Sequence, residues 1–168
     1  MINWMYFPKY KTIEPHLKEI IEVFKNNSNQ ISSQIYTLES NKVLNIIAKD
    51  LETNGYSVEK SKKANDKIKV PVLIGLNGKI EKAFEVDAYS INTKTVIEVE
   101  AGRGVTNHQF LKDFFEANIM QNVDFLCIAV RNEYRQSKDF KKVCDFFDAL
   151  YSSNKFVTPL KGLLVIGY

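Results

Sequence analysis

The chain has 168 residues, of which 45% are hydrophobic and 26% are charged, and its formal net charge is +3. This composition excludes a disordered chain, and the length accommodates one core of ordinary size rather than two domains. The small net charge permits a nucleic-acid partner without demanding one. The two cysteines favour buried thiols over a disulfide scaffold, and no apolar stretch approaches the ~20 residues of a membrane span. We therefore expect a single cytoplasmic domain.

Two amphipathic helices are predicted in the first third of the chain. The first follows Pro15, which a first helical turn tolerates. The second runs from about Tyr36 to Asn54 and ends at Gly55, a residue typical of helix C-termini. The apolar positions of the first helix are Ile13, Leu17, Ile20, Ile21 and Phe24.

The middle of the chain is predicted to form strands. A short strand is expected near residues 56–60 and another over residues 69–74. Alternating apolar side chains then predict one strand from Ala83 to Ser90 and another from Lys94 to Ala101. A turn at Asn92-Thr93 joins these two strands into a hairpin.

Helices and strands alternate in the last third of the chain. Thr106 and Gln109 form a candidate capping box for a helix, and the apolar run from Val123 to Val130 predicts a strand covered on both faces. A helix over about residues 138–151 and a strand over residues 163–166 follow. This order predicts an α/β domain with a central mixed sheet flanked by helices. We divide residues 1–168 into an N-terminal helical extension (1–35), a core (36–130) and a C-terminal helix and strand (131–168).

Four acidic residues gather on the predicted hairpin. Because side chains alternate along a strand, Glu85 and Asp87 share one face of the first strand. Glu98 and Glu100 share one face of the second strand in the same way. A two-residue turn between the strands places Asp87 opposite Glu98. It also places Glu85 opposite Glu100, whereas a three-residue turn would shift this register.

Directly opposed acids on a sheet repel one another, so their charge must be offset. A hard divalent cation, Mg²⁺ or Mn²⁺, offsets it directly because such ions prefer oxygen ligands. Three alternatives to a metal ion stay open: one or more carboxyls are protonated, lysines reach in from elsewhere, or the strand face is open to water. Glu39, near the apolar face of the second helix, is either a further contributor to a metal site or an ordinary boundary residue.

The spacing and placement of these acids resemble the PD-(D/E)XK nuclease superfamily. Asp87 is followed, after ten intervening residues, by Glu98-Val99-Glu100 at the end of a strand. The resemblance covers about residues 36–130 and implies a restriction-endonuclease-like domain that hydrolyses phosphodiester bonds with a divalent metal ion. The chain departs from the family at two positions. Glu100 occupies the usual lysine position, as in a minority of restriction endonucleases, and Val86 replaces the proline before the first acid.

The resemblance implies a role for each residue of the motif. Asp87 and Glu98 would bind Mg²⁺ or Mn²⁺ together with the carbonyl oxygen of Val99. Glu100 would accept a proton or hold a second metal ion. Lys112, on the following helix, is a candidate for the positive charge that the missing lysine would have supplied.

Residues beyond the second strand are candidates for nucleic-acid contacts. Arg103 lies between Gly102 and Gly104, whose small size would let a phosphate approach the backbone, and a helix N-terminus follows. A flexible turn accounts for the same glycines equally well. Asn107 and His108 lie at this helix start, where His108 is expected to act as a solvated cap residue more than as a catalytic base. The remaining candidates are Arg131 and Arg135.

These predictions favour a metal-dependent endonuclease of restriction or repair type that acts on DNA, with RNA as the alternative substrate. A rival interpretation is a catalytically inactive nuclease-fold module that binds nucleic acid or a protein partner. Glu100 in the lysine position and the modest net charge favour this rival. No separate DNA-reading domain is recognisable in the sequence, so double-strand cleavage would require a homodimer.

Overall fold

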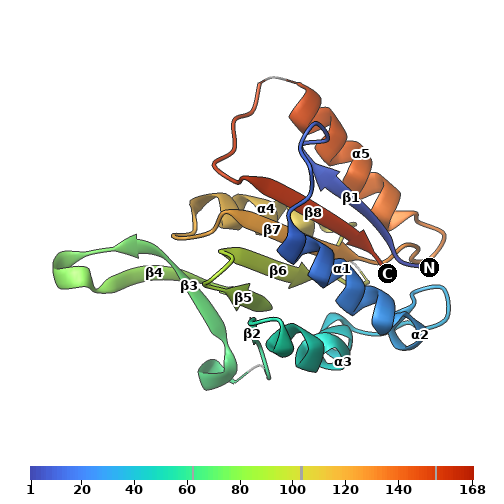
Figure 1. Cartoon of the computed structure of the whole chain (residues 1–168), viewed down its shortest axis with the longest axis horizontal. Helices are drawn as coiled ribbons and strands as arrows, with labels where there is room; N and C mark the ends of the chain where they lie inside the picture. Colours follow the sequence, from blue (N-terminus) through green and yellow to red (C-terminus); the bar gives the residue numbers. More distant parts are fainter. Residues whose placement is uncertain (62, 103, 154) are drawn as a thin grey trace.

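The chain folds around one six-stranded mixed sheet in a computed structural model that describes residues 1–61, 63–102, 104–153 and 155–168 (Figure 1). In spatial order, the strands of this sheet are β1 (Asn3–Phe7), β8 (Gly162–Gly167), β7 (Phe125–Val130), β6 (Thr95–Val99), β5 (Ala88–Ser90) and β2 (Ser57–Val58). β6, β7 and β8 run parallel to one another, and the other neighbours are antiparallel. The mixed sheet predicted from the sequence is confirmed.

Helices cover both faces of the sheet (Figure 1). They are α1 (Pro15–Asn26), α2 (Ser28–Ile31), α3 (Ser40–Thr53), α4 (Gln109–Ile119) and α5 (Asp139–Ser152). α1 and α3 pack on one face, and α4 and α5 pack on the other. The predicted α/β class is therefore confirmed. Within the described residues, no helix combines the length and the apolar character needed to cross a bilayer.

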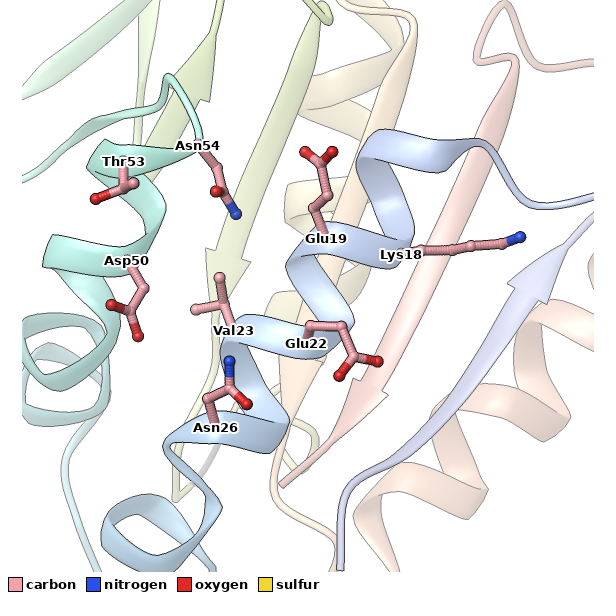
Figure 2. Close-up of a pocket in the computed structure, with 8 residues that line it drawn as sticks. All are labelled: Lys18, Glu19, Glu22, Val23, Asn26, Asp50, Thr53 and Asn54. Atoms are coloured by element: carbon pink, nitrogen blue, oxygen red, sulfur yellow. The ribbon is translucent and has the colours of Figure 1, made fainter.

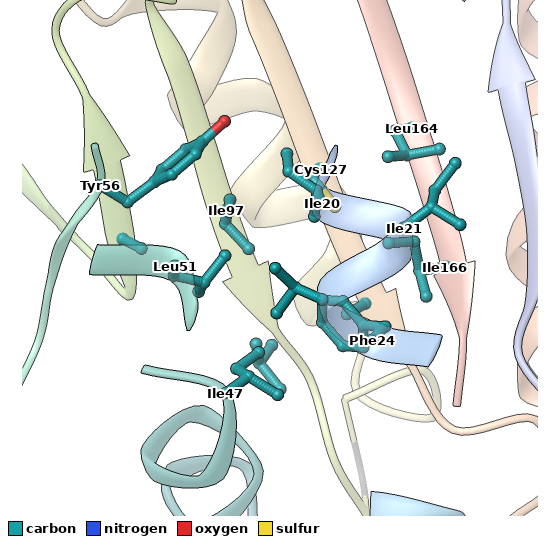
Figure 3. Packing of buried hydrophobic residues seen from close by; sticks show 14 of the residues in the cluster. Ile20, Ile21, Phe24, Ile47, Leu51, Tyr56, Ile97, Cys127, Leu164 and Ile166 are labelled. Atoms are coloured by element: carbon teal, nitrogen blue, oxygen red, sulfur yellow. The ribbon is translucent and has the colours of Figure 1, made fainter. Parts of the chain in front are cut away.

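Alternation along the strands divides the interior into two cores. Cys127 packs toward α1 and α3, whereas the next residue, Ile128, packs toward α4 and α5. All residues of β7 and β8 are buried, so their continuous apolar runs belong to strands covered on both faces, as predicted. Figure 3 shows the first core, where Ile20, Ile21, Phe24, Ile47 and Leu51 meet Ile97, Cys127, Leu164 and Ile166.

The N-terminal segment contributes a strand as well as a helix. Residues Asn3–Phe7 form β1 at the edge of the sheet, and the sequence did not reveal it because only its last two residues are buried. The second predicted helix, α3, begins at Ser40, later than expected. Its end is confirmed: Gly55 has a φ of +85°, and the N–H of Tyr56 donates to the carbonyl of Leu51 at 3.1 Å.

The strand expected from Ala83 to Ser90 is in fact two strands that belong to different sheets. β4 (Ile80–Val86) pairs with β3 (Ile68–Ile74) in a two-stranded sheet that projects from the rest of the molecule (Figure 1). β5 begins at Ala88 and belongs to the main sheet. The chain changes sheet at Asp87, so this residue lies at a break between strands.

Phe147 gives a direct test of the core between α4, α5 and the sheet. It is fully buried, and its ring centroid lies 5.0 Å from that of Phe114 and 5.8 Å from that of Phe110. Phe147→Ala should lower the free energy of unfolding by about 3–5 kcal/mol because it leaves a cavity. Phe115→Ala, at a residue that is 55% exposed, should lower it by about 1 kcal/mol or less. Urea unfolding measures both changes, and equal losses would contradict the packing.

Candidate active site

The register of the β5–β6 hairpin agrees with the sequence-based prediction. Ala88 pairs with Ile97 in an antiparallel ladder. One residue further along, the same register places Asp87 opposite Glu98. The predicted register is therefore confirmed over Ala88–Ser90, and Asp87 lies one residue outside the ladder, at the position that this register sets opposite Glu98.

Asp87 completes the edge of β6 with its side chain. The N–H of Glu100 donates to the carbonyl of Ala129 on β7 at 2.7 Å, so the N–H and C=O of Val99 point the other way, toward β5. Because β4 has left the sheet there, the N–H of Val99 donates to Oδ2 of Asp87 instead, at 2.7 Å. The N–H of Glu59 donates to the carbonyl of Asp87 at 2.8 Å. The carboxylate of Asp87 is thus bound to β6, and its backbone is bound to the residue that follows β2.

Glu98 and Glu100 face α4. Val96, two residues before Glu98, packs in the core with α4 and α5, and alternation gives the two acids the same direction. Glu98 is only 9% exposed. Gly104 leaves room for the second acid, since a Cβ at this position would overlap the carboxylate of Glu100. The two acids are therefore enclosed by the sheet, α4 and the loop that precedes α4.

A fourth acid, Asp113, joins this group from α4. It is 6% exposed and lies on the buried stripe of the helix. Sequence reasoning selected the neighbouring Lys112 and missed Asp113. Helical spacing is the signal that could have found it, because Asp113 follows Phe110 by three residues and precedes Ala117 by four.

Burial raises the pKa of all four carboxyls. It raises the pKa of Asp87 to about 6, although the hydrogen bond from Val99 opposes the shift. Burial and then the charge of Asp87 raise the pKa of Glu98 well above its ordinary value. Burial also raises the pKa of Glu100, and burial together with the charge of Glu100 raises that of Asp113 to about 8. The site therefore favours protons or a cation over a bare cluster of negative charges.

Glu85 lies outside this cluster, so the predicted pairing of Glu85 with Glu100 is wrong. Its strand, β4, has turned away from the main sheet, and its side chain is 53% exposed. Nζ of Lys67 lies 3.6 Å from its carboxylate and 2.9 Å from that of the buried Glu59. Lys67, from the lysine-rich segment, therefore neutralises acids next to the cluster.

Lys112 and Glu39 lie at the margin of the site. Nζ of Lys112 is 3.8 Å from Oδ1 of Asp113 and 3.2 Å from Oε2 of Glu116, and its side chain is 58% exposed. Glu39 immediately precedes α3 instead of lying on its apolar face, and it is exposed. It lines a hollow of about 490 Å³ whose wall also includes Ala101 and Gly102.

The start of α4 differs from the expected one. The helix begins at Gln109, its N-cap residue His108 has a φ of +57°, and no side-chain cap hydrogen bond forms. The capping box of Thr106 and Gln109 is therefore wrong. The carbonyl of Gly104 accepts the N–H of Gln109 at 2.7 Å, so the helix start offers fewer free amides to an anion than expected. Asn107 and His108 are exposed there.

The candidate arginines differ in their freedom to bind a partner. Arg131 is 5% exposed, and its guanidinium donates to the carbonyl of Leu38 and lies 4.7 Å from the ring of Tyr134. It therefore holds surrounding loops together and is not presented to solvent. Arg135 is exposed, 5.2 Å from the same ring. Arg103 lies outside the described residues.

The donor set of the cluster fits a hard divalent cation. Carboxylate oxygens are the ligands that Mg²⁺ and Mn²⁺ prefer, and Oδ2 of Asp113 is buried with no hydrogen-bond partner in the described part of the chain. Among those residues, no ion pair neutralises Asp87, Glu98 or Glu100. No three acidic, histidine or cysteine side chains of the described ranges already surround a common point. Side chains would therefore turn toward an ion as it binds.

A separate groove lies between α1 and α3, with a volume of about 410 Å³ (Figure 2). These helices cover the face of the sheet opposite to α4, so the groove is not part of the acidic cluster. Its wall consists of Lys18, Glu19, Glu22, Val23, Asn26, Asp50, Thr53 and Asn54.

Comparison with solved structures identifies the fold. The crystal structure of restriction endonuclease BglII complexed with a DNA 16-mer matches with a TM-score of 0.57 and 13% sequence identity, over 99% of this chain and 75% of that chain. The chain has the restriction-endonuclease fold. Free BglII gives a TM-score of 0.54 and 13% identity, over 99% of this chain and 78% of that chain. No protein-family model and no curated protein matches the sequence. The resemblance to PD-(D/E)XK nucleases is confirmed at the level of this fold.

The raised pKa values predict that the protein loses stability as the pH rises. Between the ordinary pKa of an aspartate, 3.8, and the folded value of about 8 for Asp113, the folded chain binds more protons than the unfolded chain. The free energy of unfolding therefore falls with increasing pH. Asp113→Asn should raise it at pH 8 by about 1 kcal/mol or more, because one pKa unit corresponds to about 1.4 kcal/mol.

Thermal unfolding in EDTA at pH 5 and pH 8 measures this effect. Asp145→Asn, at an exposed acid paired with Lys141, is the control and should leave the pH dependence unchanged. A pH dependence that is identical in the wild type and in Asp113→Asn would contradict the assignment of the shift to Asp113.

Proposed function

We propose that this protein is a metal-dependent endonuclease of restriction or repair type that hydrolyses phosphodiester bonds in DNA. Its active site would be formed by Asp87, Glu98 and Glu100. The observation that carries this proposal is the gathering of buried acids at the point where the chain changes sheet. The restriction-endonuclease fold supports nuclease chemistry, and BglII, which shares the fold, was crystallised with DNA.

Asp87 and Glu98 are the proposed ligands of Mg²⁺ or Mn²⁺. Their positions are opposite each other in the hairpin register, and the carbonyl of Val99 points toward the side of β6 on which Asp87 lies. When bound, such an ion polarises a phosphate oxygen and lowers the pKa of water, so that hydroxide forms near neutral pH. Glu39 is exposed and immediately precedes α3, so we propose that it contacts the metal ion only through a bound water molecule.

Glu100 is the proposed acceptor of the proton from the attacking water. Burial raises its pKa, and a base works best when its pKa lies near the working pH. Lys112, exposed at the rim, is proposed to supply a positive charge to a phosphate. Together, the proton acceptor Glu100 and the positive charge of Lys112 would replace the lysine that most family members carry at the position of Glu100.

Exposed side chains around the cluster are proposed to contact the DNA backbone. Asn107 and His108 lie at the start of α4, and Arg135 is exposed beyond β7. Arg131 is proposed to act indirectly, since its guanidinium lies 4.7 Å from the ring of Tyr134, against which Arg135 also lies. Double-strand cleavage by this chain would require a homodimer, and RNA is the alternative substrate.

A second candidate function is nucleic-acid binding without cleavage. Two observations favour it: Glu100 stands where most family members have a lysine, and no ion site is fully assembled among the described residues. DNA binding that weakens steeply with salt, without cleavage in Mg²⁺ or Mn²⁺, would support this function.

Replacement of either proposed metal ligand should abolish most of the activity. Asp87→Asn and Glu98→Gln should each lower metal-dependent cleavage of plasmid DNA by about 100-fold or more, because metal-ion catalysis contributes several kcal/mol. Initial rates in Mg²⁺ and in Mn²⁺, followed by gel electrophoresis, measure the effect.

Glu85→Gln is the matched control for these variants. It removes an acid two residues from Asp87 that lies outside the cluster, and it should leave the cleavage rate unchanged. Cleavage that survives both Asp87→Asn and Glu98→Gln would refute the assignment. The same assay with single-stranded and structured RNA separates the two substrate classes.

A further inference from the structure

We infer that Asp113 is an additional ligand of the divalent cation proposed at Asp87 and Glu98, which it would hold from the side of α4 together with Glu98 and Glu100. The inference rests on the proposed metal-dependent function of this site and extends it. It adds a residue of α4 that the family motif does not include. Sheet and helix would then both supply ligands to the same ion.

Asp113 is a buried acid with one oxygen unaccounted for. It is 6% exposed, and no donor of the described ranges hydrogen-bonds to its Oδ2. Its carboxyl meets that of Glu100 only by sharing a proton, which a bound ion would replace. Its Oδ1 lies 3.8 Å from Nζ of Lys112, which is longer than a hydrogen bond. A buried acceptor without a partner costs about 1–3 kcal/mol. Such groups persist in native folds mainly where an ion, a ligand or water completes their bonding.

The phase of α4 directs Asp113 at the other acids. Phe110 and Ala117, on the same stripe of the helix, pack in the core against the sheet. Glu98 and Glu100 face α4 from the opposite side. Their charges act on one another: Asp113 contributes to the raised pKa of Glu98, and Glu100 contributes to that of Asp113. The three carboxyls are therefore within electrostatic reach of one another, and a bound ion would draw them together, since no three acids of the described ranges yet surround a common point.

A divalent cation suits this position better than a lysine or a water molecule. Lys112 supplies a nearby ammonium, but it is largely exposed and lies closer to Glu116, at 3.2 Å, than to Asp113. Water would leave ionised carboxylates without compensation, and protons held by the acids would be released as the ion binds. Mg²⁺ neutralises two charges and binds oxygens at about 2.0–2.1 Å. Such short bonds suit a tight space, and the space is tight here because even a Cβ at position 104 would overlap the carboxylate of Glu100.

Mn²⁺ binding in the absence of DNA tests the role of Asp113. The electron paramagnetic resonance signal of free Mn²⁺ gives the Kd of the wild type and of each variant. Asp113→Asn keeps the shape of the side chain but removes its charge, and it should weaken Mn²⁺ binding by about 10-fold or more. Asp145→Asn, at an exposed acid of α5 paired with Lys141, should bind Mn²⁺ as the wild type does.

Asp113→Ala provides a second variant that should show the same loss, and unfolding curves in EDTA verify that both variants fold. Unchanged Mn²⁺ affinity in both variants would overturn the inference, as would a wild type that binds no Mn²⁺. The nuclease proposal is judged separately, by cleavage. Weakened Mn²⁺ binding supports Asp113 as a ligand even if the wild type leaves DNA intact. If the wild type cleaves DNA but the Asp113 variants bind Mn²⁺ with full affinity, the role of Asp113 is contradicted and the nuclease proposal is not.

Discussion

The hydrogen bond from the N–H of Val99 to the carboxylate of Asp87 is the contact on which the site depends. It replaces a ladder bond that β6 loses when β4 turns away into the projecting hairpin. The side chain therefore both completes the sheet and fixes an acid beside Glu98. A hydrophobic residue at position 87 would leave a buried N–H without a partner, and a residue that continued the strand would remove the break that makes room for the site.

The cluster is electrostatically unfavourable on its own, and this is the strongest physical indication that it is a functional site. Burial raises the pKa of Asp87, Glu98, Glu100 and Asp113 together, and the charges of Asp87, Asp113 and Glu100 add to the shift at Glu98. The acids next to the cluster, in contrast, have a cationic partner, because Lys67 forms ion pairs with Glu59 and Glu85. Groups with strongly perturbed pKa values in one enclosed place are typical of functional sites. Because the cluster lies in a restriction-endonuclease fold, phosphodiester hydrolysis is the reaction that we propose for it.

Short-range rules explain which parts of this structure were predictable. Strand alternation and hairpin register gave the position of Asp87 opposite Glu98 and the common face of Glu98 and Glu100, because both depend only on local geometry. The change of sheet at Asp87 depends on pairing with β3, which alternation within one strand does not reveal. The burial of Arg131 likewise results from a distant contact, with the carbonyl of Leu38. Helical periodicity could have placed Asp113 on the buried stripe of α4. A polar residue on such a stripe is, however, easily assumed to face the solvent.

An anomalous difference map from crystals soaked in Mn²⁺ tests most directly whether these acids form a metal site. The expected result is a peak in contact with the carboxylates of Asp87 and Glu98 and the carbonyl of Val99, with the side chains turned toward it. A map without a peak at millimolar Mn²⁺, in which Asp87 keeps its bond to Val99 and the other acids keep their positions, would contradict the metal site and the nuclease function proposed from it.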